Sequence, residues 1–196
     1  MRKKLIIAGL FCVLFLCGCK SKTELGKDDI MVVFYADYNE NSYEISAEIL
    51  DFQNDEGSFI KTAYGSSFEI AYENLVKSLK KPPYTGHAGA LIIGDGLCEN
   101  SLYETINFFS GVSLISPNIA VMLTEDDIRD FKPNSIYDKI KNETLEKLPL
   151  YTLFLPENKI SSIPVISAVE NEPQNTGNAV FEDFIFKYYV SDKKED

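Results

Sequence analysis

Apolar residues occur in nearly unbroken runs at three places along the chain, and each run predicts an interior strand of a sheet. The runs fall within residues 30–36, 88–93 and 118–123. Runs of this kind are typical of strands that are covered on both faces. Residues 43–49 instead alternate between apolar and polar side chains, which predicts a strand with one face in water. Turn residues at 37–42 precede it, so we expect the first two strands to form a hairpin.

Apolar residues at helical spacing predict helices that pack on this sheet. The clearest helix starts at Ser66 or Ser67, either of which can cap it, and ends before Pro82-Pro83. Further helices are expected through residues 102–109 and 136–148. The three acidic residues at 125–127 are expected in the first turn of another helix, where they would complement its macrodipole.

Two more strands are expected near the end of the chain, at residues 164–169 and 179–190, joined by a polar loop. Together with the earlier elements they predict a fold of the α+β or α/β class. We expect one mixed β-sheet with an N-terminal hairpin and with helices packed on it.

The first twenty residues carry the pattern of a lipoprotein signal peptide. Three basic residues at positions 2–4 precede the apolar run 5–16, and Leu16-Cys17-Gly18-Cys19 follows. An aliphatic residue, then a small residue directly before a cysteine, form a lipobox. It predicts cleavage between Gly18 and Cys19 and a diacylglyceryl thioether on Cys19. The run is too short for a transmembrane helix, which needs about 20 apolar residues.

This signal divides the chain into four expected parts. Residues 1–18 are the signal peptide, 19–28 a lipid-anchored tether, 29–190 one α/β domain, and 191–196 a charged tail. The mature protein is therefore expected to be lipid-anchored to the outer face of a bacterial cell membrane. Cys17 is a poor acceptor, because bulky Leu16 would then occupy the cleavage position.

The charge of the chain excludes one class of partner. Processing removes the three basic residues of the signal, which leaves 16 basic against 30 acidic residues, or about −14. A polyanion such as nucleic acid is repelled by this charge, so no nucleic-acid partner is expected. The same average charge predicts no unspecific adhesion of the domain to anionic lipid headgroups.

Few residues are available for catalysis or for metal binding. After processing, Cys98 is the one cysteine that remains free, and His87 is the one histidine of the chain. We therefore expect no disulfide, no metal site, no cofactor beyond the lipid on Cys19, and no catalytic residue. Asp126 and Asp127 could serve an enzyme only if carboxylates from elsewhere in the fold converge on them.

Two partial motifs suggest ligand binding, and each lacks a required residue. Gly94-Asp95-Gly96 between a strand and a helix is reminiscent of a dinucleotide fingerprint, but Glu99 stands where the third glycine belongs. The acidic and amide residues from Asp37 onward have calcium-loop spacing, but Ser42 occupies the position that needs glycine. A strand-to-helix turn and a hairpin turn are the better interpretations.

The order of several short motifs is similar to the start of the Ger(x)C lipoproteins, the C subunits of nutrient germinant receptors in endospore-forming bacteria. The resemblance covers about residues 12–130, and more weakly 164–181. The matching segments after the lipobox are Thr62-Ala63-Tyr64-Gly65, Tyr84-Thr85-Gly86-His87, Leu91-Ile92-Ile93-Gly94, Asn107-Phe108-Phe109 and residues 117–123.

The resemblance implies an N-terminal α/β domain, anchored at the spore inner membrane and assembled with multi-pass germinant receptor subunits. It implies a role in nutrient-triggered spore germination without catalysis. Family members usually carry further domains, so we expect a form that is reduced to the first one. Lys20 stands where a tryptophan is often found. Gly86 is expected to adopt unusual backbone angles and His87 to donate to a carbonyl, as structural or partner contacts.

A second hypothesis is a small solute-binding lipoprotein that delivers a ligand to a membrane transporter. Such proteins generally need a cleft between two lobes. A deep pocket lined by aromatic residues such as Tyr35, Tyr64 or Tyr84 would favour this hypothesis, whereas a filled surface would favour the interaction domain.

Overall fold

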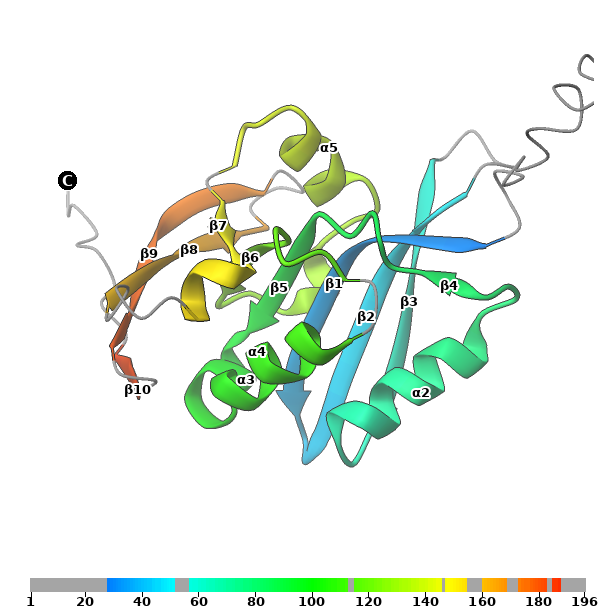
Figure 1. Ribbon diagram of the computed structural model, residues 1–196, viewed down its shortest axis with the longest axis horizontal. Coiled ribbons are helices and arrows are strands. Elements are labelled where there is room, and N and C mark those ends of the chain that lie inside the picture. Colours follow the sequence, from blue (N-terminus) through cyan, green and yellow to red (C-terminus); the bar gives the residue numbers. More distant parts are fainter. Residues whose placement is uncertain are drawn as a thin grey trace, which may run out of the picture.

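The strands form one mixed sheet. The computed structural model describes residues 28–51, 57–112, 115–145, 147–154, 160–168, 173–182 and 185–187. The strands are β1 (Asp29–Asn39), β2 (Ser42–Leu50), β3 (Ser58–Gly65), β4 (Pro83–Tyr84), β5 (Ala90–Gly94), β6 (Ala120–Thr124), β7 (Leu148–Pro149), β8 (Ile160–Ser167), β9 (Gln174–Glu182) and β10 (Ile185–Lys187). Their order is β10-β9-β8-β6-β5-β1-β2-β3, and β4 pairs with β1 and β7 with β6 (Figure 1).

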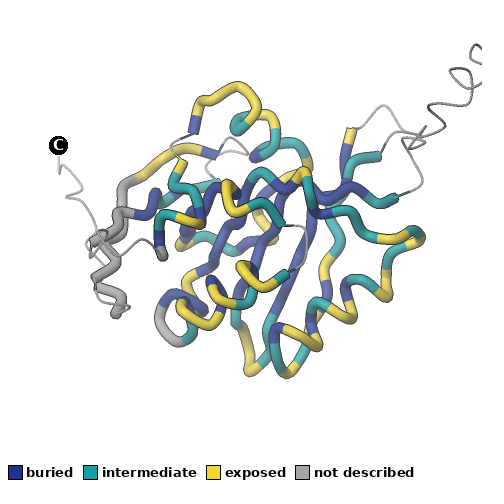
Figure 2. The backbone as a smooth tube through the Cα atoms, viewed as in Figure 1, coloured by how far each residue is buried: buried dark blue, intermediate teal, exposed yellow. Residues whose placement is uncertain are grey.

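The sheet has a parallel centre. β1, β5, β6 and β8 run parallel to their neighbours in this group, whereas β2 and β3 continue the sheet in antiparallel pairing. We call the side at which the parallel strands end the carboxyl end of the sheet, and the opposite side its amino end. Figure 2 shows the central strands as almost continuously buried. The three interior strands expected from apolar runs are thereby confirmed.

A tight turn joins β1 to β2 at the carboxyl end. Asn39 pairs with Ser42, so Glu40 and Asn41 alone form the turn, with φ of 50° and 64°. Two consecutive left-handed residues match the twist of the flanking strands. The strands therefore extend further into the expected turn segment 37–42 than the sequence pattern predicts.

Helices cover both faces of the sheet. α2 (Phe68–Ser78), α3 (Asp95–Asn100) and α4 (Leu102–Gly111) pack on one face, together with the 3₁₀ helix η2 (Leu150–Phe154). α5 (Ser135–Lys141) and the 3₁₀ helix η1 (Ile128–Asp130) pack on the other face. The two apolar clusters under these helices make the core. The expected fold, a mixed sheet with an N-terminal hairpin and packed helices, is confirmed as α+β.

The local sequence explains how α2 begins and ends. The Ser67 hydroxyl accepts a hydrogen bond from the Ile70 N–H at 3.4 Å, and Phe68, Ala71 and Leu75 are buried against the sheet. The helix ends at Ser78 rather than directly before Pro82. Leu79 already adopts extended backbone angles, with φ of −74° and ψ of 152°, and thereby ends the helix.

One expected helix is shorter than predicted, and one expected helical turn does not form. α5 ends at Lys141 and not at residue 148, because Glu143 adopts a left-handed φ of 57° that terminates the helix. Residues 125–127 do not form a helical turn. The Thr124 hydroxyl there accepts from the Asp126 N–H at 3.1 Å, and the Asp127 side chain caps η1 instead.

Within the described ranges, no helix combines the length and the apolar character needed to cross a membrane. The expected signal peptide, almost all of the tether, and the charged tail lie outside the described residues.

Candidate functional site

The predicted processing site cannot be located in the fold. Leu16, Gly18 and Cys19 lie outside the described residues. Cleavage and lipidation at this position therefore stay predictions.

Gly86 and His87 lie in the connection between β4 and β5, at the amino end of the sheet. A side chain at Gly86 would come within 2.7 Å of the Tyr84 hydroxyl. Gly86 has no left-handed φ, so the expectation of unusual backbone angles is wrong. Glycine is needed at this position because the Tyr84 ring leaves no room for a side chain. The His87 ring is exposed and packs edge-on against Tyr84, with centroids 5.3 Å apart. A partner contact at His87 stays a prediction.

The two glycines of Gly94-Asp95-Gly96 serve the packing of β1. Asp37, at 5% exposure, accepts from the Tyr38 N–H at 2.8 Å and from the Asn39 amide at 2.9 Å. A side chain at Gly94 would collide with the Asp37 carboxyl group, and one at Gly96 with the Tyr38 carbonyl. This close approach explains why glycine is needed at both positions without a nucleotide.

Asp126 and Asp127 make separate structural contacts. Asp126 accepts from the Ser167 hydroxyl and from the Ala168 N–H, both at 2.6 Å. Asp127 is paired with Arg129, and the hydrogen bonds from that guanidinium lower the pKa of Asp127. Among the described residues, no group of three or more His, Cys, Asp or Glu side chains could hold a metal ion. The thiol of Cys98 is buried.

The polar face of β2 is buried, which the sequence did not indicate. Glu44, Ser46 and Glu48 are 1%, 3% and 0% exposed. The expectation that this strand is half in water is therefore wrong. The segment from η1 to α5 covers this face, although it lies more than 80 residues further along the chain. We call Tyr35, Glu44, Ser46, Glu48 and Ser58 the polar seam.

Glu48 connects three elements within the polar seam. Its Oε1 accepts from the Ser58 hydroxyl at 2.6 Å and from the Asn134 N–H at 2.7 Å. Its Oε2 and the Tyr35 hydroxyl have no hydrogen-bond partner among the described residues. Burial raises the pKa of Glu48 above its ordinary value, although these two hydrogen bonds oppose the shift. Burial, and then the charge of Glu48, raises the pKa of Tyr35.

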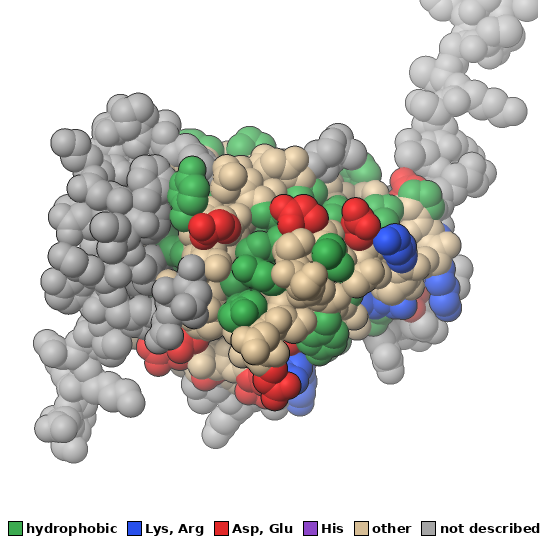
Figure 3. All heavy atoms as spheres, turned by 90° about the horizontal axis from the view of Figure 1, so that it is seen from below, with side chains coloured by type: hydrophobic (Ala, Val, Ile, Leu, Met, Phe, Trp, Pro, Cys, Tyr) green, Lys and Arg blue, Asp and Glu red, His purple; other side chains and the backbone are tan. Residues whose placement is uncertain are grey.

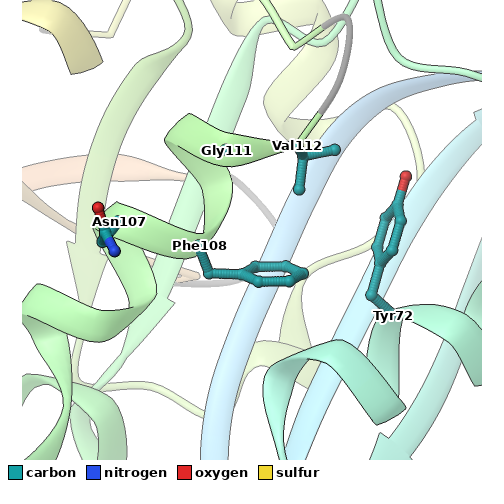
Figure 4. A pocket seen from close by; sticks show the side chains of 5 residues that line it. All are labelled: Tyr72, Asn107, Phe108, Gly111 and Val112. Atoms are coloured by element: carbon teal, nitrogen blue, oxygen red, sulfur yellow. The ribbon is translucent and has the colours of Figure 1, made fainter.

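An open aromatic groove lies between α2 and α4 (Figure 4). It has a volume of about 400 Å³ and is lined by Tyr72, Asn107, Phe108, Gly111 and Val112. Phe108 stacks on Phe68 with centroids 5.5 Å apart and meets Tyr72 edge-on at 5.8 Å. We call this the aromatic groove. It can accept apolar side chains, and no charged residue lines it.

The sequence contained one signal for the groove. Phe108 and Phe109 are adjacent, and adjacent residues of a helix point in directions about 100° apart. Phe109 is fully buried on the sheet, so Phe108 must face elsewhere. The apolar stripe alone predicts packing on the sheet, whereas the pair Phe108 and Phe109 adds this second direction.

Comparisons with known proteins identify one family. A family model described as the spore germination protein N-terminal domain matches residues 21–166. No curated protein matches the chain. A solved structure, the crystal structure of the GerBC protein, is similar with 14% sequence identity and a TM-score of 0.40. The match covers 76% of this chain and 48% of that chain, so this chain spans about half of its length.

Proposed function

The chain belongs to the family of spore germination protein N-terminal domains, and on that premise we propose that it is a lipid-anchored, non-catalytic interaction domain acting in nutrient-triggered germination. The observation that carries this proposal is the family match, which spans about three quarters of the chain. The proposed partners are multi-pass germinant receptor subunits in the spore inner membrane.

The proposed anchor explains how such a domain could act without chemistry of its own. A diacylglyceryl group on Cys19 supplies two acyl chains, enough for stable membrane attachment where one chain would be marginal. A short tether then confines the domain near the bilayer and raises its effective concentration toward membrane partners. Cys19 is therefore the residue on which the function depends most, with Leu16 and Gly18 directing its processing.

The described surface is compatible with binding to another protein. The aromatic groove offers partly exposed Tyr72 and Phe108 side chains, and exposed apolar patches are typical of protein contacts. Asp126 and Asp127, the two carboxylates considered for catalysis, are engaged in contacts with Ser167 and with Arg129. These contacts support a binding role over an enzymatic one.

The solute-binding hypothesis gains no support from its three tyrosines. Tyr35 is fully buried, and Tyr64 is half exposed at the carboxyl end of the sheet. Tyr84 lies at the amino end, where β4 pairs with the start of β1. The three side chains do not line the aromatic groove. We therefore keep the interaction domain as the proposed function.

The test compares two cysteines that are two positions apart. Cys19→Ser should release the protein from the membrane fraction and remove the mass of the diacylglyceryl group. Cys17→Ser should leave both unchanged, since Leu16 makes Cys17 a poor acceptor. Spores carrying only the Cys19→Ser protein should germinate more slowly in nutrients. Membrane retention of an unmodified Cys19→Ser protein would refute the anchor, and normal germination without the gene would refute the role.

A further inference from the structure

The charged residues of the domain are unevenly distributed between the two ends of the sheet. α2 runs antiparallel to β3 and ends at the amino end, followed by the loop that carries Lys80 and Lys81. This loop is fixed to the start of β1, because the Asp29 N–H donates to the Pro82 carbonyl at 2.9 Å. The Lys81 N–H donates to the Asp29 carboxylate at 3.2 Å. Both lysines are thereby held at the amino end.

α5 brings a second group of lysines to the same end. Ile140 on this helix lies against Gly89, which directly precedes β5, so the helix ends over the amino end of the sheet. Lys139 and Lys141 stand in its last turn. The Lys147 ammonium group donates to the Ile140 carbonyl at 3.0 Å, which holds it nearby. We call the set Lys77, Lys80, Lys81, Lys139, Lys141 and Lys147 the lysine face.

The carboxyl end of the sheet is acidic. Figure 3 looks onto this end, where Asp and Glu side chains are spread over the surface while most of the Lys and Arg side chains in view lie toward the right. Arg129 is the basic residue placed among these acids, and it is paired with Asp127. The acids at this end include Glu40, Asp95, Glu125, Asp126 and Asp127, together with the buried Asp37 and Glu44.

The amino end carries acids as well, and within the described residues its six lysines are matched by six acids, so this end is close to neutral. Asp28, Asp29, Asp51, Asp138 and Glu143 lie there, and Glu73 is paired with Lys77 at 3.0 Å. The tether segment adds Lys20, Lys22 and Lys27 against Glu24. The amino end is close to neutral while the carboxyl end is acidic, and an electric field acts on this difference.

The described chain begins at the amino end, with Asp28. β1 has 11 residues, which at about 3.3 Å each puts the hairpin tip about 35 Å from this point. The proposed anchor at Cys19 is nine residues from Asp28, and a chain reaches at most about 3.6 Å per residue. The lysine face therefore stays within a short distance of the bilayer, whereas the hairpin tip can be turned away.

We propose that the lysine face rests on anionic lipid headgroups and that the acidic carboxyl end points away from the membrane. This orientation rests on the proposed anchor at Cys19. The average charge of the chain opposes adhesion of the free domain. The nine-residue tether, at most about 32 Å long, keeps the domain beside the surface, so that the lysine face can come within a Debye length of roughly 10 Å. Anionic headgroups then repel the acidic carboxyl end more strongly than the near-neutral amino end with its exposed lysines, which leaves the carboxyl end for protein partners.

Single tryptophans can report the orientation, because the chain contains none. Ser78→Trp places the probe beside the lysine face, and Tyr103→Trp places it on exposed Tyr103 in the first turn of α4. The chain from Cys19 onward is coupled through that thiol to a maleimide lipid, while Cys98 is buried at 2% exposure. This coupling tests orientation even if the cell does not acylate Cys19, so failure of the anchor and failure of the orientation are separate results.

The readout is quenching by nitroxide attached to lipid headgroups. In vesicles with about 30% phosphatidylglycerol, we expect the Ser78→Trp probe to be quenched about twofold more than the Tyr103→Trp probe. The difference should shrink in pure phosphatidylcholine and in about 0.5 M salt. It should also shrink when Lys80, Lys81, Lys139 and Lys141 are replaced by Gln, whereas replacement by Arg is the charge-matched control and should preserve it.

Two results would overturn the proposal. Equal quenching of both probes in anionic vesicles would show that the domain has no preferred orientation. A difference that persists in phosphatidylcholine, in high salt and in the glutamine variant would show that the tether or an apolar contact sets the orientation instead of charge.

Discussion

The two faces of β2 have opposite chemistry and the same burial. Ile45, Ala47 and Ile49 pack under α2 in the larger apolar cluster, while Glu44, Ser46 and Glu48 lie under the segment from η1 to α5. All six residues are less than 9% exposed. Alternation along a strand therefore reports that its two faces differ, and it does not report which face is in water.

The difference predicts two kinds of response to mutation. On the apolar face stability comes from packed area and from the absence of voids. On the polar face each group depends on specific hydrogen-bond partners, and a lost partner leaves a buried donor unsatisfied. The predictions below compare the two faces, from the largest expected effect to the smallest.

Ile45→Ala should cause the largest loss. Ile45 is fully buried, and removing its side-chain atoms leaves a cavity, which typically lowers the free energy of unfolding by about 2–5 kcal/mol. Chemical denaturation followed by circular dichroism measures this. The conservative Ile45→Val, which removes one methylene, should cost about 0.5–1.5 kcal/mol. Equal losses for the two variants would contradict a packing origin.

Glu48→Ala should cause an intermediate loss of about 1–3 kcal/mol in the free energy of unfolding. It removes the acceptor that the buried Ser58 hydroxyl and the Asn134 N–H share, and it leaves Ser58 only the Asn134 side-chain oxygen at 2.9 Å. Glu48→Gln is the matched variant, because its amide oxygen can still accept from both groups. If the glutamine variant is destabilised as strongly as the alanine variant, the hydrogen bonds are not what Glu48 contributes.

The polar face should also make stability depend on pH. Burial raises the pKa of Glu44 and of Glu48 above 4.5 in the folded chain, so the folded state binds protons more tightly than the unfolded state. Their contribution is fully present below about pH 4.5 and is lost as pH rises through the raised folded-state pKa values.

Denaturant titrations at several pH values between 4.5 and 8 should therefore show the free energy of unfolding falling with pH. The double variant Glu44→Gln, Glu48→Gln should flatten this slope. Asp127 acts in a different window, because its pKa is lowered below 3.8 and its contribution is lost only in stronger acid. A slope that is unchanged in the double variant would assign the effect to other groups.

Ser46→Ala should have the smallest effect, less than about 1 kcal/mol in the free energy of unfolding. The Ser46 hydroxyl is 2.7 Å from the Thr62 hydroxyl, and Thr62 is exposed. In the variant the Thr62 hydroxyl can therefore form a hydrogen bond with water instead, so no buried polar group is left without a partner. Thermal unfolding of Ser46→Ala beside Glu48→Ala checks the order, and a larger loss at Ser46 would contradict it.

The sequence predicted what depends on local patterns. The apolar runs at 30–36, 88–93 and 118–123 became β1, β5 and β6, and Ser67 caps α2 as expected. These features were accessible because continuous burial and helix capping are encoded within a few neighbouring residues. The interpretation of Gly94-Asp95-Gly96 as a strand-to-helix turn agrees with the structure, where the two glycines lie between β5 and α3.

The sequence did not predict what depends on distant contacts. Glu44 and Glu48 are buried by residues more than 80 positions away, so they have the local pattern of exposed residues. α5 ends at Lys141 because Glu143 is left-handed, although no glycine marks that position. The aromatic groove arises where α2 and α4 meet, and neither helix encodes it alone. The processing site at Cys19 remains a prediction from the sequence.

The C-terminal strands are attached to the sheet more narrowly than they are to each other. β8 pairs with β9 from Ile160 to Ser167, but it meets β6 at the single register pair Leu123 and Val165. Asp126 reinforces this junction through Ser167 and Ala168. A hairpin held in this way can detach as a unit while β1, β2 and β5 stay paired, so its backbone amides would exchange with deuterium through a subglobal opening. We therefore expect deuterium exchange to be faster in β8 and β9 than in β1, β2 and β5.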